Sequence, residues 1–160
     1  MGNIQVLDDH TINQIAAGEV IERPSAAIKE LIENAIDASS RRIQVSVRDG
    51  GKTFLSVTDD GEGMNKDELP MSVERHVTSK MPGDNLTELN WLGFRGEALP
   101  SIGAVSRLRL TSRKQGSDQA WRMTVEAGAT GEVVPAALAV GTVVEVADLF
   151  FSTPARLKFM

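Results

Sequence analysis

Hydrophobic residues at helical spacing mark one stretch near the start of the chain. Between Arg23 and Ser39 the apolar positions recur every three or four residues, which predicts an amphipathic helix with one apolar face. These positions are Ile28, Leu31, Ile32, Ala35 and Ile36. Pro24 favours a first helical turn, and Ser25 and Ser39 are suited to the two ends of the helix.

The same helix carries polar residues on the side opposite those apolar positions. Glu30, Asn34 and Asp37 fall within an arc of roughly 60° at the rotation of an ideal helix. A solvated polar face explains such an arc. A carboxylate one turn from a carboxamide can also activate a water beside a metal ligand, so the helix alone leaves both interpretations open.

Alternating apolar and polar residues follow the helix. The segments Arg42–Arg48 and Thr53–Asp59 read as strands, and Asp49-Gly50-Gly51 between them is a hairpin turn signal. Asp59 shares a face with the apolar residues of its strand and is therefore expected to point inward. A buried carboxylate needs a hydrogen-bond donor. A neighbouring loop or a bound ligand would each supply one.

Beyond Asp60-Gly61-Glu62-Gly63, whose glycines allow close backbone approach or positive φ, the pattern becomes mixed. A short helix is expected at 65–75, a long polar loop at 77–91 and another helix near 96–102. Further strands are expected at Val105–Arg113, Gln119–Ala127, Glu132–Pro135 and Thr142–Leu149. Thr142 should face inward at the start of the last strand. This order predicts an α+β fold with helices layered on a mostly antiparallel sheet.

Composition narrows the class of protein. The 160 residues favour one domain, and a net charge of −5 disfavours a domain built mainly to bind nucleic-acid phosphates. The absence of cysteine excludes disulfides and thiolate metal sites. Aromatic residues make up only 4%, which disfavours a stacking platform for single strands. No run reaches membrane-spanning length and no signal peptide is visible, so a cytoplasmic protein is expected.

Familiar catalytic motifs are missing. The chain has no P-loop and no G-x-G-x-x-G motif. Its two histidines, His10 and His76, lie far apart and outside any zinc-binding pattern. The remaining polar groups are scattered along the chain, and together they supply the parts of a nucleotide site.

Each part has a plausible role in such a site. Asp59 can accept a hydrogen bond from the exocyclic amine of adenine, and Gly93 to Gly96 can offer backbone N–H groups to phosphates at a helix start. Lys80 and Arg95 add positive charge. Asn34 offers a neutral oxygen to Mg²⁺, and Glu30 can take a proton from an attacking water.

Six sequence motifs in fixed order resemble one known family. They are INQIAAGEVIERP (12–24), KELIENAIDA (29–38), DDGEGM (59–64), RHVTSK (75–80), LGFRGEAL (92–99) and STPARLKF (152–159). The set resembles the GHKL ATPase superfamily of gyrase B subunits, heat-shock chaperones and histidine kinases. Within it the match is to MutL mismatch-repair proteins. The resemblance implies that superfamily's fold, a two-layer sandwich of helices on a mostly antiparallel mixed sheet.

The resemblance also assigns roles residue by residue. Glu30 matches the general base, and Asn34 matches the magnesium ligand. Asp59 matches the adenine-reading carboxylate, with Gly63 beside it, and Thr142 matches the threonine near Asp59 and the adenine. The residues that match the ATP lid are Thr78, Lys80, Gly93, Phe94, Arg95, Gly96, Ala98 and Leu99.

At the level of the whole protein, the resemblance implies a homodimer that works with MutS and the β-clamp and meets DNA through the dimer or through further domains. Residues 1–150 would form the ATP-binding domain, with a lid at 77–99 that is ordered by Mg-ATP as two such domains come together. Residues 151–160 would begin the connection to a second domain. No membrane contact is implied.

Three positions depart from the family pattern. Asp60 replaces the usual Asn and adds a negative charge near the site, Pro100 replaces a helix former, and Ser152 replaces an Asn. Other interpretations remain open: a gyrase-like or chaperone ATPase, a scaffold that binds nucleotide without turnover, and a DNA-binding module. The sequences QIAAGEV and STPARLKF favour the MutL-like interpretation over the gyrase-like or chaperone one.

Overall fold

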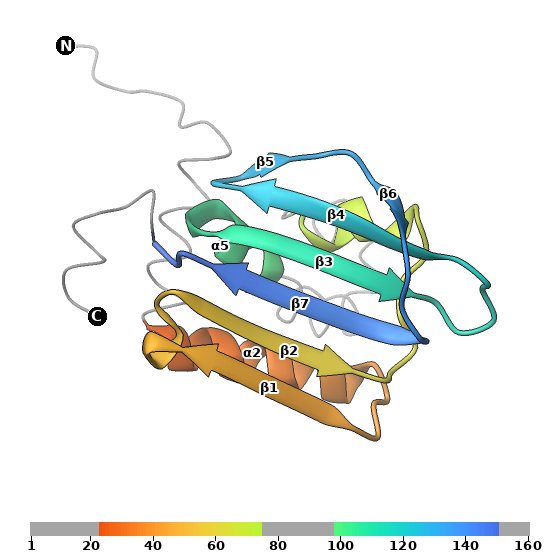
Figure 1. The fold of residues 1–160 in the computed structure, drawn as a ribbon, viewed down its shortest axis with the longest axis horizontal. Coiled ribbons are helices and arrows are strands. Elements are labelled where there is room, and N and C mark those ends of the chain that lie inside the picture. The colour runs from red at the N-terminus through yellow and green to blue at the C-terminus, as the bar shows by residue number, and fades with distance from the viewer. Residues whose placement is uncertain (1–22, 75–97, 151–160) are drawn as a thin grey trace, which may run out of the picture.

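The protein is built in two layers, a single β-sheet with helices packed on one of its faces (Figure 1). The computed structural model describes residues 23–74 and 98–150. The helices are α2 (Pro24–Asp37), α3 (Glu68–Ser72) and α5 (Ala98–Val105), and Asp49–Gly51 forms a 3₁₀ turn. The strands are β1 (Ile43–Arg48), β2 (Phe54–Asp59), β3 (Arg107–Arg113), β4 (Ala120–Glu126), β5 (Ala129–Thr130), β6 (Val134–Ala136) and β7 (Gly141–Ala147). None of these helices is long and apolar enough to cross a membrane.

The order of the strands brings distant parts of the chain together. The seven-stranded sheet runs β1-β2-β7-β3-β4-β5, with β6 beside β4, and every pairing between these strands is antiparallel. The last strand, β7, therefore lies between β2 and β3. This insertion places Asp59 directly opposite Thr142 in the sheet register. The predicted α+β class, with helices on an antiparallel sheet, is confirmed.

The core lies between the helices and the central strands. Helix α2 packs mainly over β2, and α5 packs against β3 and β4. Side chains exposed by no more than 2% fill this layer, among them Leu31, Leu55, Val57, Ile102, Leu110 and Val146. Burying such side chains is the main favourable term in folding, because it removes apolar area from water.

The buried side of α2 differs from the predicted apolar face. Its buried residues are Pro24, Ala27, Leu31 and Ala35, whereas Ile36 is 60% exposed. Ile36 lies about half a helical rotation away from Ala27, so both cannot face one sheet. The first residue of the helix is indeed Pro24, but Arg23 precedes it as N-cap without a side-chain hydrogen bond, and Ser25 does not serve as the cap.

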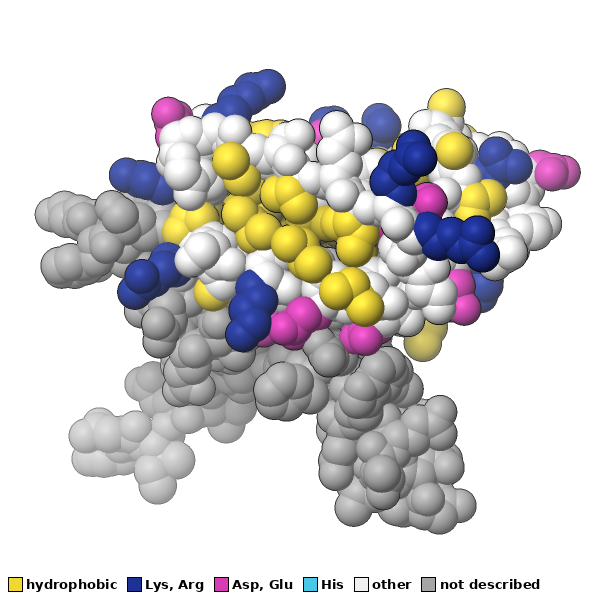
Figure 2. All heavy atoms as spheres, turned by 90° about the horizontal axis from the view of Figure 1, so that it is seen from below, with side chains coloured by type: hydrophobic (Ala, Val, Ile, Leu, Met, Phe, Trp, Pro, Cys, Tyr) yellow, Lys and Arg dark blue, Asp and Glu magenta, His cyan; other side chains and the backbone are white. Residues whose placement is uncertain are grey.

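The apolar residues of β1 lie on the same face of the sheet as the buried residues of β2, but they are themselves only partly buried. Val45 pairs with buried Val57 and Val47 pairs with buried Leu55, so all four project toward the helix layer. However, β1 is the edge strand, and Val45 and Val47 are 40% and 50% exposed. Figure 2, which views this edge, shows hydrophobic side chains gathered on the surface.

The observed ends of several helices and strands differ from those predicted from the sequence. Helix α5 continues to Val105, where the sequence predicted the start of a strand, and β3 begins at Arg107. Every residue of α5 except Leu99 is buried, so its sequence lacks the polar stripe that would reveal a helix. The Ser106 hydroxyl donates to the Ile102 carbonyl at 2.7 Å and satisfies an acceptor in the last turn. Helix α3 is shorter than predicted, and the two-residue β5 was not predicted.

Candidate functional site

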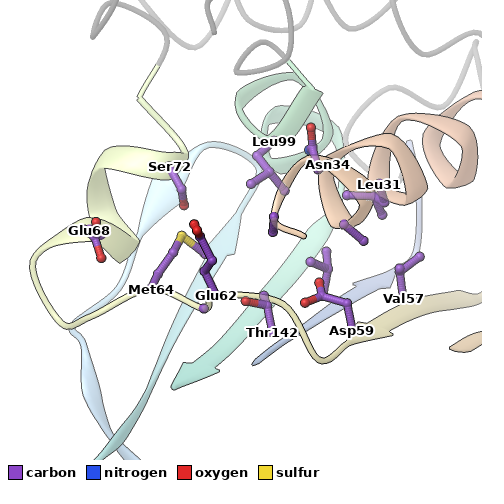
Figure 3. A pocket seen from close by; sticks show the side chains of 14 residues that line it. Leu31, Asn34, Val57, Asp59, Glu62, Met64, Glu68, Ser72, Leu99 and Thr142 are labelled. Carbon is purple, nitrogen blue, oxygen red and sulfur yellow. The ribbon is translucent and has the colours of Figure 1, made fainter. Parts of the chain in front are cut away.

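A cleft opens between the helices and the ends of two central strands (Figure 3). Its volume is about 380 Å³, which is in the range of small-molecule sites. Asn34 on α2 lies above it, and Asp59 on β2 and Thr142 on β7 lie side by side below. Its walls are formed by Leu31, Asn34, Ala35, Ala38, Val57, Asp59, Glu62, Gly63, Met64, Glu68, Ser72, Leu99, Thr142 and Val144. Five predicted site residues are therefore brought together: Asn34, Asp59, Gly63, Leu99 and Thr142.

Asp59 forms the polar centre of the cleft floor. Burial raises the pKa of this carboxyl, whereas the Gly61 amide, which donates to Oδ1 at 2.8 Å, lowers it. The Thr142 amide also favours the charged form, and the negative charge of Asp60 opposes it. An ionised carboxylate accepts several hydrogen bonds through its two oxygens, so Asp59 keeps acceptor capacity toward the cleft. The predicted inward orientation is what the structure shows.

A serine that no motif pointed to lies beside this carboxyl. The Ser40 Oγ is buried and makes no hydrogen bond of ordinary geometry. It lies near enough to Asp59 to lower the pKa of that carboxyl slightly, as a weaker influence than the Gly61 amide. Gly61 has no room for a side chain, because a Cβ there would meet Ser40 Oγ and the Ala38 carbonyl.

The loop after β2 packs against the end of β3 and the residues that follow it. Gly63 adopts a positive φ of 72°, and a Cβ at this position would collide with the Arg113 carbonyl. The Glu62 carbonyl accepts a hydrogen bond from the Gln115 amide at 2.7 Å. The backbone does pass close to another group at Gly63, as predicted, and that group is the backbone at the end of β3.

Helix α2 contributes its carboxamide to the cleft. Asn34 is half-buried and lines the cleft next to Leu31 and Ala35, so it borders the buried side of the helix instead of facing away from it. Glu30 lies one turn earlier, is also half-buried and is not among the residues that line the cleft. Asp37, the third residue of the predicted polar arc, is exposed.

Asp60 has a structural role outside the cleft. Its Oδ1 accepts hydrogen bonds from the amides of Arg41 and Arg42 at 2.8 and 2.9 Å, just before β1 begins. These backbone bonds hold the pKa of Asp60 below its ordinary value. Asp60 does not line the cleft. Its direct influence on the site is the repulsion that it exerts on Asp59.

Most of the predicted lid lies outside the described residues. This applies to Thr78, Lys80, Gly93, Phe94, Arg95 and Gly96. Ala98, at the start of α5, is 1% exposed, and only its neighbour Leu99 reaches the cleft. Pro100 is buried within the same helix.

Sequence reasoning missed several walls of the cleft. Val57 and Val144 alternate with Asp59 and Thr142 on their strands, so the period of two already placed them on the same face. Glu62, Glu68 and Ser72 come from a loop and from α3, where no periodicity signals orientation.

The cleft offers few oxygen atoms that together could hold a cation, so a cation there would be coordinated mainly by the phosphates of a bound molecule and by water. No group of three or more His, Cys, Asp or Glu residues able to hold a metal is found within 23–74 and 98–150. Mg²⁺ commonly takes few protein oxygens and completes its shell with phosphates and waters. The half-buried Asn34 carboxamide at the cleft wall is compatible with that kind of site.

Comparison with known proteins gives a family for this site. The model of the family described as histidine kinase-, DNA gyrase B-, and HSP90-like ATPase matches residues 21–142. The DNA mismatch repair protein MutL of Paramagnetospirillum magneticum is 58% identical over 158 residues, covering 99% of this chain and 26% of the relative. The MutL of Rhodospirillum rubrum is 59% identical over 157 residues, covering 98% and 25%.

Solved structures give the same result. The Aquifex aeolicus MutL ATPase domain complexed with ADP matches with a TM-score of 0.71 and 33% identity, covering 88% of this chain and 48% of that one. This chain spans about a quarter of the length of the MutL relatives. The resemblance inferred from the six motifs is confirmed, and the chain belongs to the histidine kinase-, DNA gyrase B- and HSP90-like ATPase family, within which it is similar to MutL.

Proposed function

We propose that this chain binds Mg-ATP in the cleft below α2 and hydrolyses it, as the ATPase domain of a MutL-type mismatch repair protein. The observation that carries the proposal is the register pair of Asp59 and Thr142 at the floor of a cleft of about 380 Å³. A partly desolvated carboxylate beside a hydroxyl is suited to an exocyclic amine. The family match and the ADP complex of the Aquifex aeolicus relative support the same ligand class.

The base would enter between the sheet and α2. Leu31, Val57 and Val144 supply apolar walls that can cover a planar ring, while Asp59 accepts from its amino group. Guanine carries a carbonyl oxygen at the corresponding position, which would face the Asp59 carboxylate and lose a hydrogen bond. Adenine should therefore be preferred over guanine.

The phosphates would lie toward Asn34 and the segment 77–97. Mg²⁺ would be held by the Asn34 carboxamide oxygen and by phosphate oxygens, and when bound it neutralises phosphate charge. Glu30 would orient a water for attack on the γ-phosphorus and accept its proton. The bond from that phosphorus to the bridging oxygen then breaks, giving ADP and inorganic phosphate.

For the whole protein, we propose a switch in mismatch repair. ATP contact with the lid at 77–99 would order it and bring two such domains together, and hydrolysis would reverse this change. Coupling to MutS, to the β-clamp and to DNA would then link mismatch recognition with strand excision in the cytoplasm. These partners are inferred from the resemblance to MutL proteins, and the MutL relatives are about four times as long as this chain.

A titration with ATP and GTP in the presence of Mg²⁺ tests the nucleotide site. Asp59→Asn should weaken ATP binding about 10- to 100-fold, because its remaining oxygen can stay with the Gly61 amide while an NH₂ donor replaces the charged acceptor that faces the adenine amine. Asp60→Asn is the matched control, since this neighbouring carboxylate lies outside the cleft and should change the Kd by less than about twofold. Equal affinity for ATP and GTP in the parent chain would refute the adenine site.

Hydrolysis is tested separately in a chain that includes the following domain. Glu30→Ala should keep Mg-ATP binding and abolish turnover, whereas Asn34→Ala should weaken binding only when magnesium is present. Unchanged ATP turnover in Glu30→Ala would show that Glu30 is not the general base. The resemblance implies that the second domain supplies a lysine to the γ-phosphate. The isolated 160 residues should therefore hydrolyse ATP far more slowly than the longer chain, and equal rates would contradict that role of the second domain.

A further inference from the structure

A buried hydrogen-bond cluster lies beside the floor of the cleft, on the strand that pairs with β7. At its centre is Ser112 on β3, whose exposure is 0% and which no sequence motif had singled out. Ser112 Oγ accepts from the Met64 amide at 2.7 Å, and it lies 3.0 Å from the Gly141 carbonyl oxygen. It also lies 2.7 Å from Thr142 Oγ1, where either hydroxyl could be the donor.

Counting donors and acceptors decides the direction of that last bond. A serine hydroxyl has one proton and two lone pairs. The Met64 amide can only donate and the Gly141 carbonyl can only accept, so these two partners use one lone pair and the proton of Ser112. The second lone pair is then filled only if Thr142 donates to Ser112.

The opposite direction leaves groups unsatisfied. If Ser112 gave its proton to Thr142, the Gly141 carbonyl would lose this contact and one lone pair of a fully buried hydroxyl would stay empty. Buried polar groups are costly to leave without partners, so the arrangement that uses all three contacts is favoured. Thr142 therefore donates its proton across the strands to Ser112 and not into the cleft.

We propose that Ser112 is a positioning residue that fixes Thr142 as a hydrogen-bond acceptor facing the cleft. Thr142 is only 8% exposed and lines the cleft opposite Asp59 in the sheet, so both polar groups of the floor then present lone pairs. This floor selects a ligand edge that donates, either an amino group or a water that donates to both residues. It disfavours a carbonyl oxygen at the same place.

The inference rests on the proposed adenine-nucleotide function and adds a second source of base selectivity. Adenine offers an amino group at position 6, and guanine offers an oxygen there. When Thr142 cannot turn its proton toward the cleft, it cannot donate to that oxygen. Ser112 thereby contributes to the rejection of guanine without touching the base.

The experiment measures the ratio of the dissociation constants of GTP and ATP, with Mg²⁺ present, in the chain, in three single variants and in one double variant. Ser112→Ala frees the Thr142 proton to turn into the cleft, so the ratio should fall about 5- to 10-fold. The ratio is informative because both nucleotides need the same folded protein, and a partly unfolded variant weakens both equally. Ser112→Cys keeps the shape of the side chain and a weak donor and acceptor in a slightly larger group, so it should change the ratio in the same direction by a smaller factor.

The third variant separates positioning from packing. Thr142→Val removes the hydroxyl through which Ser112 acts, so adding Ser112→Ala to it should leave the ratio of Thr142→Val unchanged. A ratio in Ser112→Ala and Ser112→Cys equal to that of the parent would overturn the inference while leaving the ATP site intact. A further fall in the double variant would also overturn it. A parent chain without ATP preference would overturn the proposed function itself.

Discussion

Two neighbouring carboxylates show how far environment decides the role of a residue. Asp59 and Asp60 follow each other at the end of β2, yet burial raises the pKa of Asp59 and backbone amides lower that of Asp60. Alternation along the strand turns the first toward the cleft and the second toward the amides of Arg41 and Arg42. The negative charge of Asp60, where the family usually has Asn, is therefore stabilised mainly by hydrogen bonds from backbone amides.

The lowered pKa of Asp60 predicts an acid-dependent loss of stability. The folded pKa lies below the unfolded one, so the stabilisation is complete above the ordinary Asp value and is lost as the pH falls below about 4. Asp60→Asn keeps the Oδ1 acceptor but cannot titrate. In urea unfolding this variant should be less stable than the parent at pH 7, because it lacks the charge, and the difference should close as the pH falls below about 4. Parallel decline of the two proteins would contradict this account.

At the scale of elements, the loop after β2 shows that close packing of backbone can shape a site. Gly63 lines the cleft and is held against the Arg113 carbonyl at the end of β3. The amide of Met64, the next residue, donates to Ser112 on the same strand. One turn therefore joins the ends of two strands that are not neighbours in the sheet.

A pair of glycine substitutions measures this constraint. Gly63 and Gly116 both have positive φ, of 72° and 88°, but a Cβ at Gly116 meets nothing within 4 Å. Gly116→Ala should cost about 1–2 kcal/mol from backbone strain alone. Gly63→Ala adds a collision with backbone and should cost about 4 kcal/mol or more, as measured by denaturant unfolding. Equal costs would mean that the loop yields easily.

At the scale of the whole molecule, one helix layer covers a sheet that is wider than itself. Helix α2 packs mainly over β2 and leaves β1 at the edge with its helix-facing side partly open. As a result, residues of β1 and β2 that point to the same face of the sheet differ in how far they are buried. The apolar patch in Figure 2 follows from this incomplete cover and not from an irregular strand.

Two valines in register make this difference measurable. Val57 is 1% exposed and its partner Val45 is 40% exposed. Val57→Ala should lower the free energy of unfolding by about 2 kcal/mol, through lost burial and a cavity. Val45→Ala removes the same atoms from a half-open position and should cost about 0.5 kcal/mol. Urea unfolding of both variants checks the ratio, and similar losses would show that β1 is as well covered as β2.

The sequence by itself determined those features that depend on local periodicity. The helix from Pro24, the alternating strands of 43–48 and 54–59, and the inward orientation of Asp59 and Thr142 follow from repeats of about 3.6 and 2 residues. The six motifs added the family, which the comparisons confirmed. The individual roles of the lid residues stay predictions.

The tertiary structure alone decided which of these features meet. Insertion of β7 between β2 and β3 placed Thr142 between Asp59 on one side and Ser112 on the other, although Ser112 reads as an ordinary strand residue. It also decided that β1 lies at an edge and that Asp60 binds backbone. Pairing between distant segments depends on the packing of the whole chain, so a local pattern of apolar and polar residues does not predict which strands become neighbours.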